Sequence, residues 1–296
     1  MHILVSDFYK QKFGTKVYKL SIDAGCTCPT RDGTLGTGGC IFCSASGSGD
    51  FTPSRQLSIP QQIEEAKKLV DSKFSRKKNV QKKYIAYFQN FTNTYGNHDR
   101  LKSLYQEAVN CQDVVGISIA TRPDCLDDDI LQFIASLTKQ TFVQLELGFQ
   151  TATEETAKYV RRGFTNSVYD EAVRRVHQAS PYIHVVTHVI FGLPGDTPEL
   201  MLNSVKHALT VGTDGLKLTV LYVLQGTDLE KDYVSGKFKV LEMEEYVALV
   251  RQALKIIPEN IIIHRLTGDP PKKLLVAPQW TTDKKRVLNV MKDLLD

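Results

Sequence analysis

The stretch GCTCPTRDGTLGTGGCIFC, residues 25–43, decides how the rest of this 296-residue chain folds and what it can bind. It holds four of the six cysteines, at positions 26, 28, 40 and 43, among glycines at positions 25, 33, 36, 38 and 39. Glycine allows positive φ and close passage of backbone past a bulky ligand, so the composition predicts a loop that wraps a bound group. Cysteines at such spacings hold metals or iron–sulfur clusters more often than they pack a core.

Two ligand sets fit this spacing. Cys28, Cys40 and Cys43 supply three thiolates, and three ligands on a four-iron cube leave one iron open to an outside ligand, which suits catalysis. Cys26 with Cys28, followed by the C-x-x-C pair, would instead make a four-thiolate zinc site. Spacing alone leaves both sets open. Cys111 and Cys125 lack such partners, and we expect them to pack as small apolar side chains.

The composition is that of an ordinary globular protein, with 42% hydrophobic residues. No apolar run approaches the roughly 20 residues that a membrane-spanning helix needs. The first 14 residues lack the apolar segment of a secretory signal, so we expect a cytoplasmic protein with no membrane contact and with reduced thiols.

Residues 73–83 form a basic run, with six Lys or Arg residues and no acid, in a chain whose net charge is only +4. The run is either a solvated helix end and loop or a patch that contacts the phosphates of a nucleic acid.

Short apolar runs alternate with amphipathic stretches along the chain. We expect strands at 18–24, 84–88, 114–120, 142–149, 183–191 and 216–223, with a last strand-like run at 261–266. We expect helices at 59–75, 100–110, 127–137, 153–160, 168–179, 198–211, 243–257 and 283–294. This alternation predicts βαβ units and a parallel sheet.

The predicted fold is a single α/β domain: a partial (βα)6 barrel over about residues 17–225, with a C-terminal extension over about 226–296. A doubly wound sheet is the alternative, although no G-x-G-x-x-G motif follows a strand. In a barrel the chemistry gathers at the C-terminal ends of the strands, and the cysteine loop directly follows the first strand.

Three ionisable residues, Glu146, His188 and Lys217, interrupt apolar strands. Because strands of a parallel barrel are buried on both faces, these side chains would lie in its interior. A buried carboxylate is costly unless paired, so Glu146 indicates either a polar ligand or a structural Lys or Arg partner. An unpaired buried ammonium is also costly, which favours a functional Lys217. His188 is either structural or functional. We take Lys217 and His188 as the candidate catalytic residues.

The loop SIDAGCTCPTRDGTLGTGGCIFC resembles that of the radical S-adenosylmethionine (SAM) enzymes. YFQNFTNTY, SIATRPD, ELGFQT, RRGF, HVIFGLPGDT, GLKLTVLYVLQGT and RLTGDPP follow in the family's order. The chain looks most similar, over about residues 13–280, to bacterial stand-alone proteins related to the radical domain of the elongator catalytic subunit. The resemblance implies a 4Fe–4S cluster on Cys28, Cys40 and Cys43, with SAM chelating the open iron. A 5′-deoxyadenosyl radical would then abstract a substrate hydrogen atom.

The resemblance also implies contacts with SAM. Backbone from Gln89 to Asn93 would receive the amino group of SAM, and Arg162 would pair with its carboxylate. The remaining implied contacts are Thr121 and Arg122 near the ribose, Gly192, Leu193 and Pro194 against the adenine, and Glu146 and Gln150 elsewhere around SAM.

The sequence departs from the family pattern at two positions. Cys26 replaces an apolar aromatic residue, so we interpret it as a packing residue. Phe164 replaces the histidine of an R-G-H triplet, so the role of that histidine is not carried over.

The substrate implied by the elongator-like resemblance and the basic run is tRNA, at the C5 side chain of the wobble uridine. The chain shows no acetyltransferase domain, so we expect remodelling of an existing side chain, such as carboxymethylaminomethyl to aminomethyl. A reducing partner such as flavodoxin or ferredoxin would supply electrons. A peptide, a porphyrin or a cofactor precursor is the alternative substrate, and a zinc-stapled nucleic-acid-binding protein is the alternative without catalysis.

Overall fold

A computed structural model of the chain describes residues 2–45, 47, 52–72 and 82–294. Seven strands form one sheet in the order β1-β2-β3-β4-β5-β6-β8, and each neighbouring pair is parallel. The strands are β1 (Val17–Ile22), β2 (Lys83–Phe88), β3 (Val114–Thr121), β4 (Phe142–Gln150), β5 (Ile183–Phe191), β6 (Gly215–Val220) and β8 (Ile262–Arg265). Their order follows the chain without the reversal of a doubly wound sheet.

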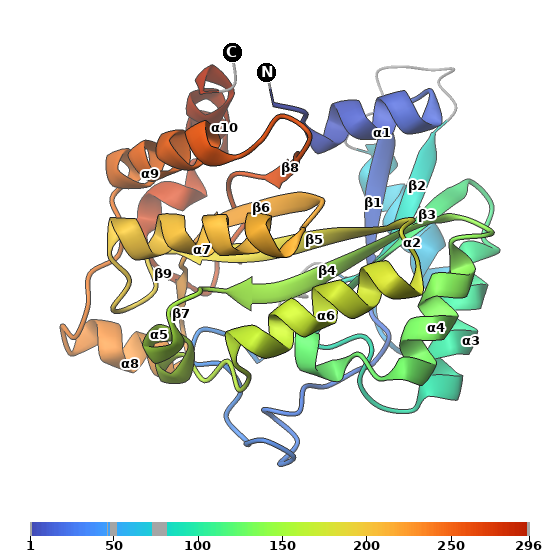
Figure 1. Cartoon of the computed structure of the whole chain (residues 1–296), viewed down its shortest axis with the longest axis horizontal. Coiled ribbons are helices and arrows are strands. Elements are labelled where there is room, and N and C mark those ends of the chain that lie inside the picture. The colour runs from blue at the N-terminus through green and yellow to red at the C-terminus, as the bar shows by residue number, and fades with distance from the viewer. Residues whose placement is uncertain (1, 46, 48–51, 73–81, 295–296) are drawn as a thin grey trace.

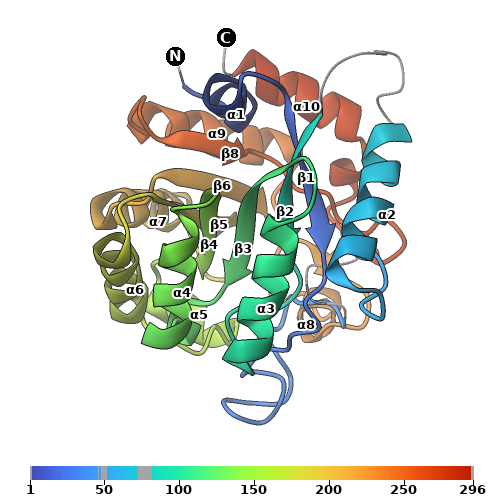
Figure 2. The same cartoon turned by 90° about the vertical axis from the view of Figure 1, so that its right-hand side faces the viewer.

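The sheet curls into a partial barrel with helices on its outer face (Figure 2). Five helices pack against the outside of β1, β3, β4 and β5 or against one another. They are α2 (Ile59–Ser72), α3 (His98–Val109), α4 (Asp128–Leu137), α6 (Asn166–Ala179) and α7 (Pro198–Val211). The other helices are α1 (Val5–Phe13), α5 (Glu154–Tyr159), α8 (Asp228–Val234), α9 (Met243–Ile256) and α10 (Lys284–Asp293), with short 3₁₀ turns η1 (Pro123–Cys125) and η2 (Gln279–Thr282).

Side-chain alternation along β4 explains this arrangement. Val143, Leu145 and Leu147 are fully buried in the apolar core, whereas Gln144 and Glu146 bond polar groups inside the barrel. Successive residues of a strand point to opposite faces, so one strand serves the outer apolar layer and the polar interior at once. The predicted α/β barrel is therefore confirmed.

Helix α1, which we did not predict, closes one end of the barrel. Tyr9 donates a hydrogen bond of 2.8 Å to Gln144 Oε1, and the ring of Phe8 stacks on that of His184. Figures 1 and 2 show α1 at one end of the strands and the loop that follows β1 at the other. Helix α1 therefore covers the N-terminal ends of the strands, and the cysteine loop lies at the opposite end of the barrel.

The C-terminal region contributes to the same sheet. The strand-like run at 261–266 is β8, which pairs with β6 and completes the sheet from within the segment that we assigned to an extension. The strand expected at 216–223 ends at Val220, and β7 (Val223–Leu224) then pairs with β9 (Leu275–Ala277) in a small antiparallel sheet. No helix in the described part of the chain is long and apolar enough to span a membrane.

Most of the basic run at 73–83 lies outside the described residues. Its last two members are engaged within the chain: Lys82 forms a 3.0 Å ion pair with Asp71, and Lys83 donates to the carbonyl of Phe13. These two lysines carry no argument for a nucleic-acid patch.

Candidate functional site

The cysteine loop is closed by an arginine. The Arg31 guanidinium donates to the carbonyls of Cys43 and Ser44, at 3.2 and 2.7 Å, while the Arg31 amide donates to the carbonyl of Cys28. Gly39 lies beside Arg31 with φ of 70°, and an added Cβ would lie 2.8 Å from Arg31 Nε, so only glycine fits this turn. The two ends of the loop are thereby drawn together.

Cys28, Cys40 and Cys43 lie within electrostatic reach of one another. The neighbouring Cys43 thiol lowers the pKa of Cys40 to about 7, and Cys40 acts on Cys43 in return by raising its pKa. Burial raises the pKa of Cys28, with a hydrogen bond from Thr92 and the charge of Arg122 opposing the rise. Three thiols so placed, one of them readily ionised, are a donor set suited to iron.

The described residues contain no group of three His, Cys, Asp or Glu side chains that could hold a single metal ion. The four-thiolate zinc site is not present among them, because Cys26 is buried in the apolar core. Burial also raises the pKa of Cys26 to about 12. The apolar surroundings of Cys26 thus favour packing over ligation for this cysteine.

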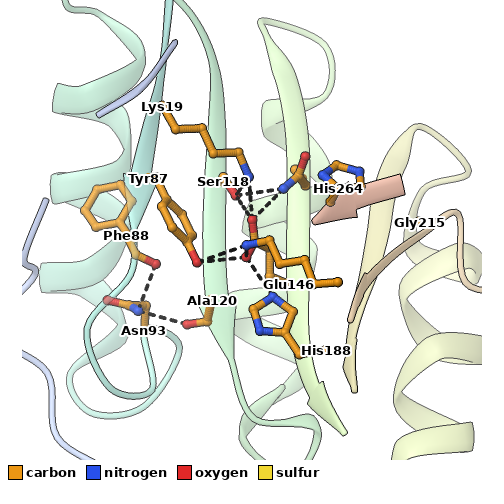
Figure 3. A network of polar contacts seen from close by, with 12 residues as sticks. Lys19, Tyr87, Phe88, Asn93, Ser118, Ala120, Glu146, His188, Gly215 and His264 are labelled. Carbon is orange, nitrogen blue, oxygen red and sulfur yellow. Dashed lines mark hydrogen bonds and ion pairs between the residues drawn. The ribbon is translucent and has the colours of Figure 1, made fainter. Parts of the chain in front are cut away.

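The segment after β2 faces the cysteine loop. Thr92 is fully buried, its amide donates to the carbonyl of Thr27, and its hydroxyl lies 3.0 Å from Cys28 Sγ. Asn93 donates to the carbonyls of Phe88 and Ala120, which leaves its Oδ1 buried without a partner among the described residues (Figure 3). Asn90 Oδ1 is buried and unpartnered in the same sense. Two orphaned acceptors in the segment that contacts Cys28 through Thr92 fit a ligand that brings an ammonium group, as SAM does.

Arg122 and Thr121 lie at the end of β3, near the cysteines. The Arg122 guanidinium donates two hydrogen bonds to Asp124, at 2.9 and 2.7 Å, and stacks over the ring of Phe164. Its charge lowers the pKa of both Cys28 and Cys40. Thr121 is engaged differently, since its hydroxyl bonds Thr94 at 2.6 Å. Arg122 is therefore a permanent positive charge beside the thiols.

Arg162 has all its donors engaged by the protein. Its five N–H groups donate to the carbonyls of Phe149, Thr151 and Phe164 and to the side chains of Glu154 and Asn166. The side chain is only 1% exposed. The expected pairing with the SAM carboxylate would require breaking these bonds, so the structure favours a structural role for Arg162.

Gln150 and the segment Gly192–Pro194 lie at the C-terminal ends of β4 and β5. Gln150 ends β4 with φ of 68°, a left-handed conformation uncommon for a residue with a side chain. Leu193 is buried in a small apolar cluster with Ile41 of the cysteine loop and Val160. The turn after β5 thus packs against the cysteine loop, at the edge where SAM is expected.

Glu146 lies at the centre of a polar network in the barrel interior (Figure 3). Its carboxylate is fully buried; Lys19 lies 2.5 Å from Oε1, and Lys217 contacts Oε2. It also accepts hydrogen bonds of 2.8 Å from Tyr87 and Ser118. These cations keep the pKa of Glu146 well below its usual range despite burial, so the group is ionised. Of the two possibilities given for Glu146, a polar ligand or a Lys or Arg partner, the structure shows the second, with Lys19 and Lys217 as partners.

Lys217 and His188 border the same network. Burial lowers the pKa of Lys217 to about 7 and that of His188 to about 4, with Glu146 opposing both shifts. His188 Nε2 lies 2.8 Å from Glu146 Oε2. At neutral pH His188 is therefore uncharged, whereas the ion pair with Glu146 favours the ammonium form of Lys217 against the effect of burial.

Sequence reasoning missed several members of this network. Lys19 interrupts the apolar run of β1 as Lys217 interrupts that of β6, so the same signal was available. Tyr87, Ser118 and Tyr9 carried no such signal, since strands and amphipathic helices commonly contain these residue types. Asn90 lies within the predicted SAM segment, but its orphaned oxygen becomes visible only in the structure.

Family models divide the chain into two parts. The model described as "Radical SAM superfamily" matches residues 33–208, and the one described as "Radical_SAM C-terminal domain" matches residues 213–296. The Bacillus subtilis protein YtqA, itself uncharacterised, is 40% identical over 97% of this chain and 87% of its own length.

More distant relatives carry functional names. Elongator complex protein 3 of Schizosaccharomyces pombe is 30% identical over 61% of this chain but only 33% of that protein. The tRNA uridine(34) acetyltransferase of Methanocaldococcus infernus is 28% identical over 55% of this chain and 30% of that protein. The chain thus matches about a third of each of these proteins.

Among solved structures, the archaeal Elp3 of Methanocaldococcus infernus with an N-terminal deletion is similar with a TM-score of 0.66. The likeness covers 94% of this chain and 63% of that one at 19% identity, so it concerns the fold alone. Together with the family model, which spans more than half of the chain, these findings confirm the resemblance noted from the sequence. The chain belongs to the radical SAM superfamily, whose enzymes use a 4Fe–4S cluster and S-adenosylmethionine.

Proposed function

We propose that this protein is a radical SAM enzyme that modifies tRNA at the C5 side chain of the wobble uridine. The observation that carries the radical chemistry is the grouping of Cys28, Cys40 and Cys43 at the open end of the barrel. Because α1 covers the opposite end, a substrate would reach the polar interior from the end that carries the cysteines. The tRNA assignment is supported by the elongator-like relatives.

Cys28, Cys40 and Cys43 would hold the cluster, and Asn90 and Asn93 would accept from the amino group of SAM. When bound, the cluster and SAM would supply the radical chemistry that breaks a substrate C–H bond. The chain's own residues then position the substrate. Lys217 and His188, our candidate catalytic residues, border the interior from β6 and β5 and would face the reacting side chain.

The substrate side chain that fits best is carboxymethylaminomethyl, converted to aminomethyl. Its glycine-like methylene carries the C–H bond to be broken. Two-electron oxidation of this methylene, with SAM as the oxidant, and hydrolysis of the C–N bond would release the two carbons as glyoxylate and leave the aminomethyl group. The carboxylate of the substrate would meet a lysine-rich interior. Such an enzyme would work in the cytoplasm with a low-potential electron donor such as flavodoxin or ferredoxin. These assignments extend the family chemistry to one substrate.

Nucleoside analysis tests the proposal. Total tRNA from a strain that lacks the gene is digested and compared by mass spectrometry with tRNA from its parent. We expect carboxymethylaminomethyl nucleosides to accumulate and aminomethyl nucleosides to disappear, with recovery on expression of the intact gene but not of Cys40→Ala. Identical wobble nucleosides in strain and parent would refute the tRNA assignment.

A second assay separates substrate classes. Reconstituted, reduced protein is incubated with SAM and with either tRNA, a peptide or a porphyrin, and 5′-deoxyadenosine is measured. Stimulation by tRNA supports the proposal, whereas stimulation by another class alone would contradict it.

A further inference from the structure

The barrel interior carries more positive than negative charge. Lys19 of β1 and Lys217 of β6 contact the two oxygens of one carboxylate, that of Glu146 on β4. Among the described residues, Glu146 is the one acid that either lysine pairs with. Two ammonium groups therefore share a single carboxylate.

A third cation lies beside them. Arg265 of β8 is the register partner of Lys217, directly after an irregularity in the pairing of β6 with β8. Its charge disfavours protonation of both Lys19 and Lys217. Within the described part of the chain Arg265 makes no hydrogen bond or ion pair with another side chain. Two buried ammonium groups therefore contact the one carboxylate, and the exposed guanidinium of Arg265 adds a third positive charge beside Lys217 on the neighbouring strand.

The other groups of the network do not balance this charge. His188 donates to the Glu146 carboxylate from Nε2 as a neutral imidazole, and Tyr87 and Ser118 are neutral donors (Figure 3). A surplus charge in a low-dielectric interior is unfavourable unless an anion accompanies it. The surplus is relieved when a ligand brings a negative group into the barrel.

We propose that Lys19, Lys217 and Arg265 form a binding site for a carboxylate, namely the terminal carboxylate of the substrate's uridine side chain. This inference rests on the proposed function. Holding the carboxylate fixes the adjacent methylene, whose C–H bond is broken in that reaction. The site would also set specificity, because side chains without the carboxylate leave the three cations unpaired.

SAM also carries a carboxylate, but its expected place is elsewhere. The cations that act most strongly on Cys28 and Cys40 are Arg122 and Arg31. The orphaned acceptors Asn90 and Asn93 belong to the segment that contacts Cys28 through Thr92. The groups expected to bind the amino-acid end of SAM thus lie beside the cysteine loop. The carboxylate site of Lys19, Lys217 and Arg265, called the lysine site below, remains for the substrate.

The test compares two anticodon stem-loop RNAs that differ at one position. One carries a carboxymethylaminomethyl side chain, and the other carries the same chain as a neutral carboxamide. Their dissociation constants are measured on cluster-loaded protein with SAM present and no reductant. We expect the wild type to prefer the carboxylate RNA by about tenfold or more, as for a desolvated charge pair.

Lys217→Met and Arg265→Met should each reduce this preference severalfold, and Lys217→Arg should keep most of it. Because Arg265 is exposed, Arg265→Met should fold normally, and its effect on the preference for the carboxylate RNA can be measured even if Lys217→Met folds poorly. Lys206→Met, on an exposed position of α7, is the matched control and should leave the preference unchanged.

Three results would overturn the proposal. One is equal binding of both RNAs by the wild type, and another is loss of affinity in the variants without loss of preference. The third is weakened SAM binding in equilibrium dialysis with the RNA preference intact, which would assign the lysine site to SAM. Failure of the proposed function has its own signature: neither modified RNA binds better than an unmodified stem-loop, and neither stimulates formation of 5′-deoxyadenosine.

Discussion

The hydroxyl of Thr92 lies 3.0 Å from the Sγ of Cys28. Thr92 is fully buried, and its amide is held by the carbonyl of Thr27, so this contact does not depend on a mobile side chain. The hydroxyl favours the thiolate form of Cys28 by lowering its pKa against the effect of burial. Hydrogen bonds to ligand sulfur are one means by which proteins set the reduction potential of an iron–sulfur cluster.

Thr92→Val should therefore make the cluster harder to reduce. The substitution keeps the shape of the side chain and removes the donor, so sulfur loses a stabilising contact with the more negative, reduced state. We expect a potential lower by roughly 20–60 mV, since 59 mV corresponds to a tenfold change for one electron. Redox titration followed by electron paramagnetic resonance measures it. Thr187→Val, which removes a buried hydroxyl bonded to Tyr169, is the control and should leave the potential unchanged.

Cys26 and Cys43 should respond differently to alanine. Cys26 packs in the apolar core, so Cys26→Ala should keep iron and visible absorbance and destabilise the protein by roughly 1–2 kcal/mol. Cys43→Ala removes one of the three proposed ligands and should abolish stable cluster binding. Iron and sulfide content per chain after anaerobic reconstitution decides this. A full cluster in Cys43→Ala, or none in a folded Cys26→Ala, would refute the ligand set.

Neighbouring arginines offer a matched pair for stability. Arg162→Met should destabilise the fold by roughly 3 kcal/mol or more, because three carbonyls and two side chains lose a buried donor. Arg161→Met removes one exposed ion pair with Asp228 and should change the free energy of unfolding by less than about 1 kcal/mol. Urea denaturation measures both. Similar small effects would mean that Arg162 has donors to spare for a ligand.

The fold could be predicted because the sequences of β4 and its neighbouring strands show directly that these strands are buried on both faces. Apolar residues flank Glu146 on both sides, as a strand covered on both faces requires, and every predicted strand is present. Helix α1 was not predicted because it is short and buries only Tyr9 against the end of the barrel, so its sequence lacks a regular apolar face. The placement of β8 in the main sheet depends on how far the sheet curls, which local sequence does not report.

The site could be predicted in part. The cysteines of the loop could be identified as ligands from their spacing. Glu146 could be identified as a site residue because it is a charged residue within an apolar strand. What pairs with Glu146 depends on Lys19, which lies 127 positions earlier on β1 and meets it only when the sheet curls. The engagement of Arg162 depends in the same way on carbonyls that the turn after β4 directs inward.

Buried histidines should make the protein sensitive to acid. Burial lowers the pKa of His184 to about 3, of His188 to about 4, and of His264 well below its usual range. An unfolded histidine has a pKa near 6.5, so between pH 6.5 and about 4 the unfolded chain binds more protons than the folded one. The stability contributed by these neutral imidazoles is therefore complete above pH 6.5 and is lost as the pH falls toward 4.

His188→Gln isolates one of these protons. Glutamine retains a donor toward Glu146 but does not titrate, so the free energy of unfolding should depend less steeply on pH between 6.5 and 4, by one proton or about 1.4 kcal/mol per pH unit. Urea denaturation across this range measures the slope for wild type and variant. The difference between them at pH 8, where imidazoles are neutral in both states, reports packing alone. Equal slopes would show that His188 does not stay neutral in the folded protein, and the charge surplus around Glu146 would then be larger still.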